Sequence, residues 1–195
     1  MKKIMKKIIF TLAVMFACVS ASIAQDDAFG KGSKVLNLGV GLGSYIGGSG
    51  YKSTMPPIVL SGEYGLTDAL IKKTGKGYVG VGGYLAYTAN KYSWGDYDGK
   101  DAGWKYSYII VGARGAFHYQ FVDKLDTYAG VMLGYNIAST SAYGPTGWSG
   151  AGNSVGGFTY SSFVGARYYF NDKFAAFAEV GYGIAALELG LAIKF

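Results

Sequence analysis

The chain has 195 residues, is 50% hydrophobic and carries a formal net charge of +6 from 18 basic and 12 acidic side chains. Four of the lysines lie within the first seven positions, which leaves 14 basic against 12 acidic residues for the rest, so the charge gives no reason to expect nucleic-acid binding. The 32 glycines, 18 tyrosines and only three prolines favour many short strands, and after the first 24 residues no apolar run is long enough for a spanning helix.

Residues 1–24 have the pattern of a secretory signal peptide. Four lysines precede the apolar run Ile8–Val19, and Ser22-Ile23-Ala24 offers small residues at the positions that a signal peptidase reads. We expect cleavage after this site, so that residues 25–195 form the mature domain. The one cysteine, Cys18, would leave with the signal peptide, and an exported domain without disulfides is therefore predicted.

Eight later segments alternate large apolar residues with small or polar ones, which is the two-residue period of a β-strand. In chain order they are KVLNLGVGLGS (34–44), PIVLSGEYG (57–65), GYVGVGGYLAYT (77–88), SYIIVGARGAFHYQF (107–121), TYAGVMLGYNI (127–137), FTYSSFVGARYYF (158–170), FAAFAEVGYGI (174–184) and LELGLAIKF (187–195).

The charges indicate which face of these strands lies on the outside of the fold. Every arginine and glutamate of the chain falls on the small-residue face, namely Glu63, Arg114, Arg167, Glu179 and Glu188. Opposite charges among glycines suit a crowded interior in which they pair. The other face is a continuous belt of leucine, valine, isoleucine and aromatic residues, which would be a large exposed apolar patch in water. We therefore expect the belt to face lipid.

An open sheet cannot lie in a bilayer because its edge amides would be unsatisfied, whereas a closed barrel can. The sequence predicts an all-β fold, an eight-stranded antiparallel up-and-down transmembrane β-barrel. Short connections at 122–126 and 171–173, and a longer one at 66–76, are expected on the periplasmic side. The connections at 44–56, 90–104 and 139–157 are expected outside the cell, together with a tight turn near Ala185-Ala186.

Residues 34–195 resemble the small eight-stranded outer-membrane barrels of the OmpA/OmpX type, and still more the Gly/Tyr-rich, porin-like outer-membrane β-barrel group common in Bacteroidetes-like bacteria. The signal peptide, the alternating segments, the inward Arg/Glu set and the C-terminal Phe195 carry this resemblance. It implies localisation in the cell outer membrane of a Gram-negative bacterium, with outer-membrane lipid and lipopolysaccharide as partners. It also implies insertion by the barrel-assembly machinery, whose signal in that family includes a terminal aromatic residue such as Phe195.

The inward charges allow two interpretations. They could line a narrow, gated pathway for small solutes, or they could form a plug in which buried ions must pair. The plug is favoured because an eight-stranded barrel is just wide enough for side chains to fill it.

Catalysis and metal binding are not expected. A lipid-remodelling barrel would need a nucleophile and a base near the outer leaflet, but the only histidine, His118, lies at the periplasmic end of its strand. The loop DYDGKD places Asp96, Asp98 and Asp101 together, yet it lacks the distal glutamate of a calcium loop. We expect no enzyme, no cofactor and no metal.

Aromatic residues in the long outer connections are candidate contacts for a glycan or a host protein, above all Trp94, Tyr97 and Trp148. They could instead belong to the aromatic girdle at the membrane boundary. The function expected is therefore non-catalytic, either structural support of the outer membrane or surface interaction through these loops. A narrow porin-like channel is the first alternative. A soluble, lipocalin-like ligand carrier is the second, although such a carrier would turn its apolar residues inward.

Overall fold

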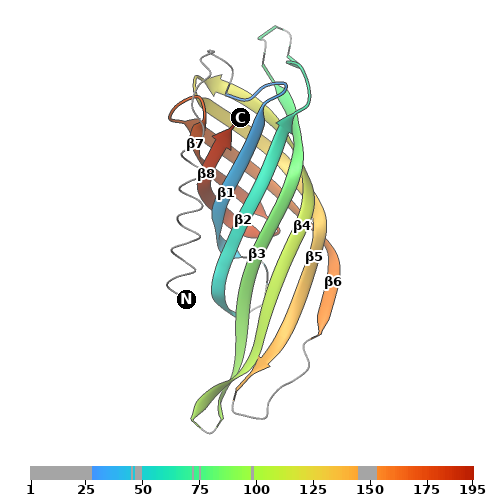
Figure 1. Cartoon of the computed structure of the whole chain (residues 1–195), viewed down its shortest axis with the longest axis vertical. Coiled ribbons are helices and arrows are strands. Elements are labelled where there is room, and N and C mark those ends of the chain that lie inside the picture. The colour runs from blue at the N-terminus through green and yellow to red at the C-terminus, as the bar shows by residue number, and fades with distance from the viewer. Residues whose placement is uncertain are drawn as a thin grey trace.

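The computed structural model describes residues 28–44, 46, 50–71, 73–74, 76–97, 99–144 and 153–195. Within these ranges the chain forms eight strands arranged in one ring (Figure 1). They are β1 (Lys34–Ser44), β2 (Lys52–Gly65), β3 (Tyr78–Tyr97), β4 (Lys100–Val122), β5 (Leu125–Tyr143), β6 (Ser154–Tyr169), β7 (Phe174–Tyr182) and β8 (Ala185–Lys194). The described ranges contain no helix that is both long and apolar enough to cross a membrane. The predicted signal peptide lies outside them.

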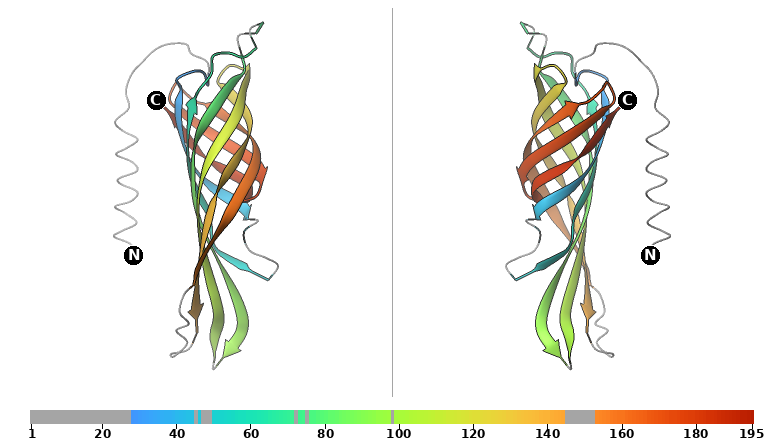
Figure 2. Two further views of the ribbon diagram at one scale, coloured as in Figure 1. Left: turned by 90° about the vertical axis from the view of Figure 1, so that its right-hand side faces the viewer. Right: turned by 90° about the vertical axis from the view of Figure 1, so that its left-hand side faces the viewer.

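The ring is closed by regular antiparallel pairing. Each strand pairs with the next one in the chain, and β1 also pairs with β8. Leu38 of β1, for example, lies opposite Leu60 on β2 and opposite Leu191 on β8. Closure leaves no strand of the ring at the edge of an open sheet, as a bilayer requires. This confirms the predicted eight-stranded antiparallel up-and-down barrel, whose strands run obliquely around the axis (Figure 2).

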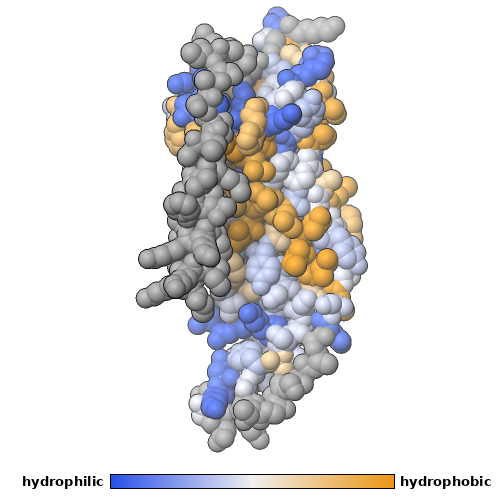
Figure 3. Space-filling view, in the orientation of Figure 1, coloured by the Kyte–Doolittle hydropathy of each residue, from blue (hydrophilic) through white to orange (hydrophobic). Residues whose placement is uncertain are grey.

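Burial alternates along the strands in the predicted sense. On β1 the side chain of Leu38 is 40% exposed, whereas that of its neighbour Asn37 is fully buried. Leu191 on β8 and Val111 on β4 are also exposed on the outside. On the face seen in Figure 3, apolar residues gather over the middle of the barrel, with hydrophilic residues above and below them. The large apolar residues thus face the surroundings and the small and charged ones face the lumen.

One predicted loop is largely strand. Residues 90–104 were expected to form an outer connection, but β3 and β4 continue their pairing through it, from Lys91 opposite Lys105 to Tyr97 opposite Lys100. The two strands form a hairpin that projects beyond its neighbours at the end opposite the C-terminus (Figures 1 and 2). Cross-strand pairs such as Tyr92 with Trp104 stabilise this hairpin without help from the membrane.

The last turn also differs slightly from the prediction. It was expected near Ala185-Ala186, whereas β7 ends at Tyr182 and β8 already begins at Ala185. Gly183 makes the difference, because its φ of 115° lies in a region that side chains disfavour.

Candidate functional site: a filled lumen and an aromatic rim

The centre of the lumen holds a buried cluster of ionic side chains. Arg114 on β4 lies between Glu63 on β2 and Glu179 on β7, with Nε 3.1 Å from Glu63 Oε1 and Nη2 2.9 Å from Glu179 Oε1. All three side chains are almost completely buried. Inward positions on three strands are thus joined by ion pairs across the barrel.

Arg167 on β6 extends this cluster toward the periplasmic end. Its guanidinium pairs with Glu63, lies 2.9 Å from Asp126 Oδ2 through Nη1, and donates from Nε to Asn37 Oδ1 at 3.0 Å. Glu63 therefore bridges both arginines. Because buried charge without a partner is costly, this arrangement holds four strands in one fixed geometry.

Aromatic rings cover the faces of both guanidinium groups. The guanidinium carbon of Arg114 lies 4.0 Å from the centroid of Phe163, and that of Arg167 lies 4.3 Å from the centroid of Tyr128. Tyr128 also donates its hydroxyl to Glu179 Oε1 at 2.9 Å. The two rings make cation–π contacts with the guanidinium groups and occupy space that solvent would otherwise take.

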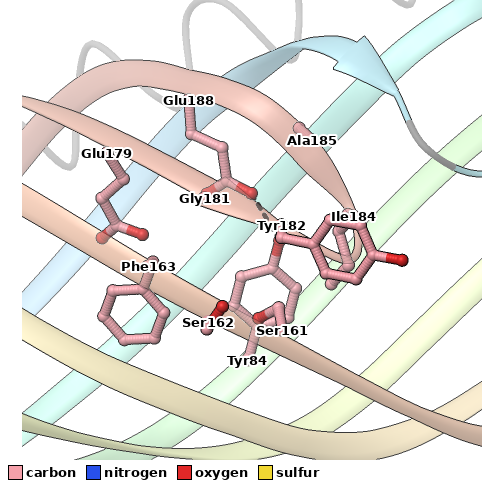
Figure 4. A pocket seen from close by; sticks show the side chains of 10 residues that line it. All are labelled: Tyr84, Ser161, Ser162, Phe163, Glu179, Gly181, Tyr182, Ile184, Ala185 and Glu188. Atoms are coloured by element: carbon pink, nitrogen blue, oxygen red, sulfur yellow. Dashed lines mark hydrogen bonds between the residues drawn. The ribbon is translucent and has the colours of Figure 1, made fainter.

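Glu188 occupies a separate level, nearer the outer end of the lumen. It accepts a hydrogen bond of 2.8 Å from the hydroxyl of Tyr84, as Figure 4 shows. The space beside this pair, toward Ile184 and Glu179, measures about 10 Å³, which is room for about one water molecule. The structure thus brings four of the five predicted lumen charges into ion pairs and gives the fifth a tyrosine as its partner.

The periplasmic end of the lumen is closed by residues that precede β1. Phe29 is 1% exposed and stacks on the ring of His118, with 3.7 Å between the ring centroids. Nδ1 of His118 lies 3.0 Å from a carboxylate oxygen of Asp126. The amide of Ala28 donates to Gln120 Oε1 at 2.8 Å. This segment is therefore folded into the mouth of the barrel.

Two members of these layers were missed by the sequence analysis. Asp126 was assigned to a periplasmic turn, although it lies in step with the inward-facing Tyr128 and is 1% exposed. Continuing the two-residue period by one step would have found it. Phe29 lies outside any periodic segment, and no pattern in the sequence marks it.

The lumen offers no open reaction site in the described part of the chain. His118 is buried beneath Phe29 at the periplasmic end, far along its strand from the outer leaflet. Among the described residues no three histidine, cysteine, aspartate or glutamate side chains are placed to hold a metal ion. In the loop DYDGKD, Asp98 and the side chain of Asp96 lie outside the description, and Asp101 is engaged by Lys91 at 3.3 Å.

The inner side of the outer rim carries paired aromatic rings. Trp94 on β3 packs edge-on against Trp104 on β4, with centroids 5.8 Å apart, and Trp94 remains 48% exposed. Tyr51, just before β2, lies 5.5 Å from Tyr92 and 5.2 Å from Tyr106. Among the predicted loop contacts, Tyr97 ends β3 but its side chain is not described, and Trp148 lies outside the described residues.

The outer side of the same hairpin is polar. Asp101 accepts hydrogen bonds from Ser93 and, at 3.4 Å, from Tyr143, and it pairs with Lys91. The hydrogen bond from Ser93, followed by the contacts with Lys91, lowers the pKa of Asp101 below its ordinary value. The carboxylate is therefore charged outside the membrane.

The C-terminus continues the barrel wall. The amide of Phe195 donates to the carbonyl of Lys34 at 2.9 Å, and the Phe195 side chain is 63% exposed. The terminal ring thus lies on the surface at the periplasmic end, free of the lumen.

Comparisons with known proteins identify the fold. The sequence matches no model of a known protein family and no curated protein. A crystal structure of Ail, the attachment invasion locus protein of Yersinia pestis, in complex with the heparin analogue sucrose octasulfate, matches 85% of this chain and 99% of its own, with 15% identity and a TM-score of 0.53.

Two further structures match with TM-scores below 0.5. The outer membrane protein Ail in a nanodisc covers 85% of this chain and all of its own at 17% identity, with a TM-score of 0.47. The N-terminal β-barrel domain of Pseudomonas aeruginosa OprF covers 86% of this chain and all of its own at 16% identity, with a TM-score of 0.43. The first likeness, together with the closed ring and the exposed apolar belt, shows that this chain has the fold of a small transmembrane β-barrel.

Proposed function

We propose that this protein is a non-catalytic outer-membrane barrel with a sealed lumen, which supports the membrane and presents its outer rim to partners. The observation that carries the proposal is the filling of the lumen at three successive levels. Phe29 and His118 close the periplasmic end, the arginine–glutamate cluster fills the centre, and Tyr84 with Glu188 closes the outer part. The space of about 10 Å³ beside Glu188 is too small for a hydrated solute.

A conductance measurement tests the seal against the porin-like alternative. Protein purified from the outer membrane is inserted into a planar bilayer, and its insertion is verified by its compact mobility before boiling. We expect no steady channel current from the wild type. A steady conductance that Arg114→Ala changes would contradict the seal and would make the arginine–glutamate cluster a gate.

The aromatic rim supports the second half of the proposal. Exposed tryptophan and tyrosine rings provide rigid contact area at low entropic cost. Trp94, Tyr51 and Tyr92 are such rings, and the half-buried Trp104 supports Trp94. Tyr97 and Trp148 are proposed to add to the same surface. The partner proposed is a glycan or a host surface protein. The Ail crystal structure contains bound sucrose octasulfate, which is a property of Ail. For the present chain that structure supports the likeness of fold.

Binding of the purified protein to a glycan array and to host-cell surface extracts tests this role. The variant Trp94→Ala/Trp104→Ala should lose at least about tenfold in affinity if stacking on each ring contributes about 1 kcal/mol. Phe170→Ala is the matched control, because Phe170 is an exposed aromatic residue at the periplasmic end. Equal binding by both variants, or no binding above protein-free detergent, would contradict surface interaction through this rim.

The lipocalin-like alternative is not proposed. A carrier of apolar ligands needs an open apolar cavity, whereas the apolar side chains inside this barrel, such as Ile110 and Met132, are fully buried against one another and the leucines face outward.

A further inference from the structure

Three lysines form a row across neighbouring strands at the outer end of the barrel. The pairing register places Lys52 of β2 opposite Lys91 of β3, and Lys91 opposite Lys105 of β4. Neighbouring strands are about 4.8 Å apart, so the three residues span about 10 Å in one line. Like charges directly opposite one another repel, which makes such a row unfavourable unless an anion lies against it.

The row faces away from the lumen. Lys91 is in step with the exposed Leu85 along β3, and Lys105 is in step with the exposed Ile109 along β4. Because residues that pair directly share one face of a sheet, Lys52 faces outward as well. The three lysines therefore do not contribute to the aromatic rim, which lies on the inner side.

The depth of the row matches the lipid headgroups. Tyr87 and Ile109 face each other at the edge of the apolar belt, and the Tyr87 hydroxyl approaches Ser107 Oγ at 3.4 Å. Lys105 follows Ser107 by one outward step, about 7 Å further along the strand. Figure 3 shows hydrophilic residues below the apolar belt, toward the outer end of the barrel.

Protein groups neutralise only part of this charge. Asp101 pairs with Lys91 at 3.3 Å, and it is the one described acidic residue that pairs with a member of the row. Within the described residues, Lys52 and Lys105 have no ion pair. Ser141, opposite Lys105, adds a hydroxyl donor to the same surface. By contrast, both arginines in the lumen are paired with carboxylates. The row thus presents donors and excess positive charge.

We propose that the lysine row formed by Lys52, Lys91 and Lys105 binds the phosphate groups of lipopolysaccharide in the outer leaflet. The row lies just beyond the outer edge of the apolar belt, at the depth where headgroup phosphates are concentrated. Its side chains are on the lipid-facing side of the strands and face away from the barrel mouth. Ammonium groups bind phosphate oxygens through charge-assisted hydrogen bonds. The inference rests on the placement of the barrel in the outer membrane. It does not depend on the sealed lumen or on a surface partner of the aromatic rim.

The test uses tryptophan fluorescence to measure the binding of purified lipopolysaccharide to the full protein in a neutral detergent. The variant Lys52→Gln/Lys91→Gln/Lys105→Gln should bind about 100-fold more weakly, from about fivefold for each lysine near a membrane surface. Lys105→Gln alone should lose about fivefold. The control variant Lys34→Gln/Lys73→Gln/Lys124→Gln removes three exposed lysines at the periplasmic end and should bind like the wild type.

Three further ligands distinguish binding of lipopolysaccharide phosphates from binding of other anions. Chemically dephosphorylated lipopolysaccharide should bind the wild type as weakly as intact lipopolysaccharide binds the triple variant, and inorganic phosphate should not compete at millimolar concentration. Equal affinity of wild type and triple variant for intact lipopolysaccharide would overturn the proposal, as would competition by inorganic phosphate. Preferential binding of soluble dextran sulfate through the row would also overturn it, in favour of a soluble anionic glycan. Compact mobility before boiling shows that each variant is folded.

Discussion

At the scale of single residues, Arg167 is the side chain on which the lumen depends most. It is fully buried and contacts partners on three other strands, Asn37, Glu63 and Asp126. Replacing it by methionine keeps most of the volume but leaves two carboxylates without this partner. We expect Arg167→Met to lower the free energy of unfolding by about 3–5 kcal/mol, measured by urea titration of the refolded barrel in lipid vesicles.

Arg167→Lys is the matched control, because it keeps the charge and loses the planar fork. It should lie between wild type and Arg167→Met. A loss below about 1 kcal/mol for the methionine variant would mean that the ion pairs of Arg167 contribute little to the barrel.

The single histidine gives a direct probe of the periplasmic closure. His118 is 1% exposed because Phe29 stacks on it. Diethyl pyrocarbonate should leave His118 unmodified in the wild type and modify it in Phe29→Ala, with the adduct located by mass spectrometry. Phe121→Ala, at an exposed aromatic residue of the same end, serves as control. Rapid modification in the wild type would show that the segment before β1 does not close the mouth.

At the scale of strands, the sequence predicts best which face of each strand points outward and which points into the lumen. A two-residue period with leucines on one face has only two possible orientations, and the position of the arginines and glutamates decides between them. The partners of each charge could not be predicted, because those of Arg167 come from β1, β2 and β5 and depend on the stagger of the closed ring. The position of Phe29 could not be predicted for a similar reason, because it depends on the ring of His118, far along the chain, and on no local pattern.

Facing also yields a prediction for a whole strand. Leu38 is in the middle of β1 and faces lipid, so Leu38→Arg should cost about 2–4 kcal/mol of stability in vesicles. Lys34→Arg, on the same face at the periplasmic end of β1, should change stability by less than about 1 kcal/mol. If both variants insert and unfold alike, β1 does not lie in the bilayer with its leucines outward.

At the scale of the whole molecule, stability and assembly make different demands on the same chain. The ionic lumen and the closed ring stabilise the finished barrel, whereas Phe195 donates a backbone hydrogen bond to Lys34 and is 63% exposed. A side chain that is so exposed in the folded state can still act during insertion, and we propose that the barrel-assembly machinery recognises Phe195. Stability and insertion therefore have to be measured separately.

Phe195→Ala separates the two, because alanine keeps the backbone hydrogen bond and removes the ring. In cells we expect several-fold less protein in the outer membrane, measured as the fraction that migrates compactly before boiling. The same variant, purified and refolded in vesicles, should unfold within about 1 kcal/mol of the wild type, since an exposed side chain loses few contacts. Phe170→Ala, an exposed aromatic residue in the turn that follows β6, should leave both quantities unchanged. Normal insertion of Phe195→Ala would show that the terminal ring is not an assembly signal. Poor insertion together with a lower free energy of unfolding would instead make Phe195 a structural residue of the β1–β8 seam.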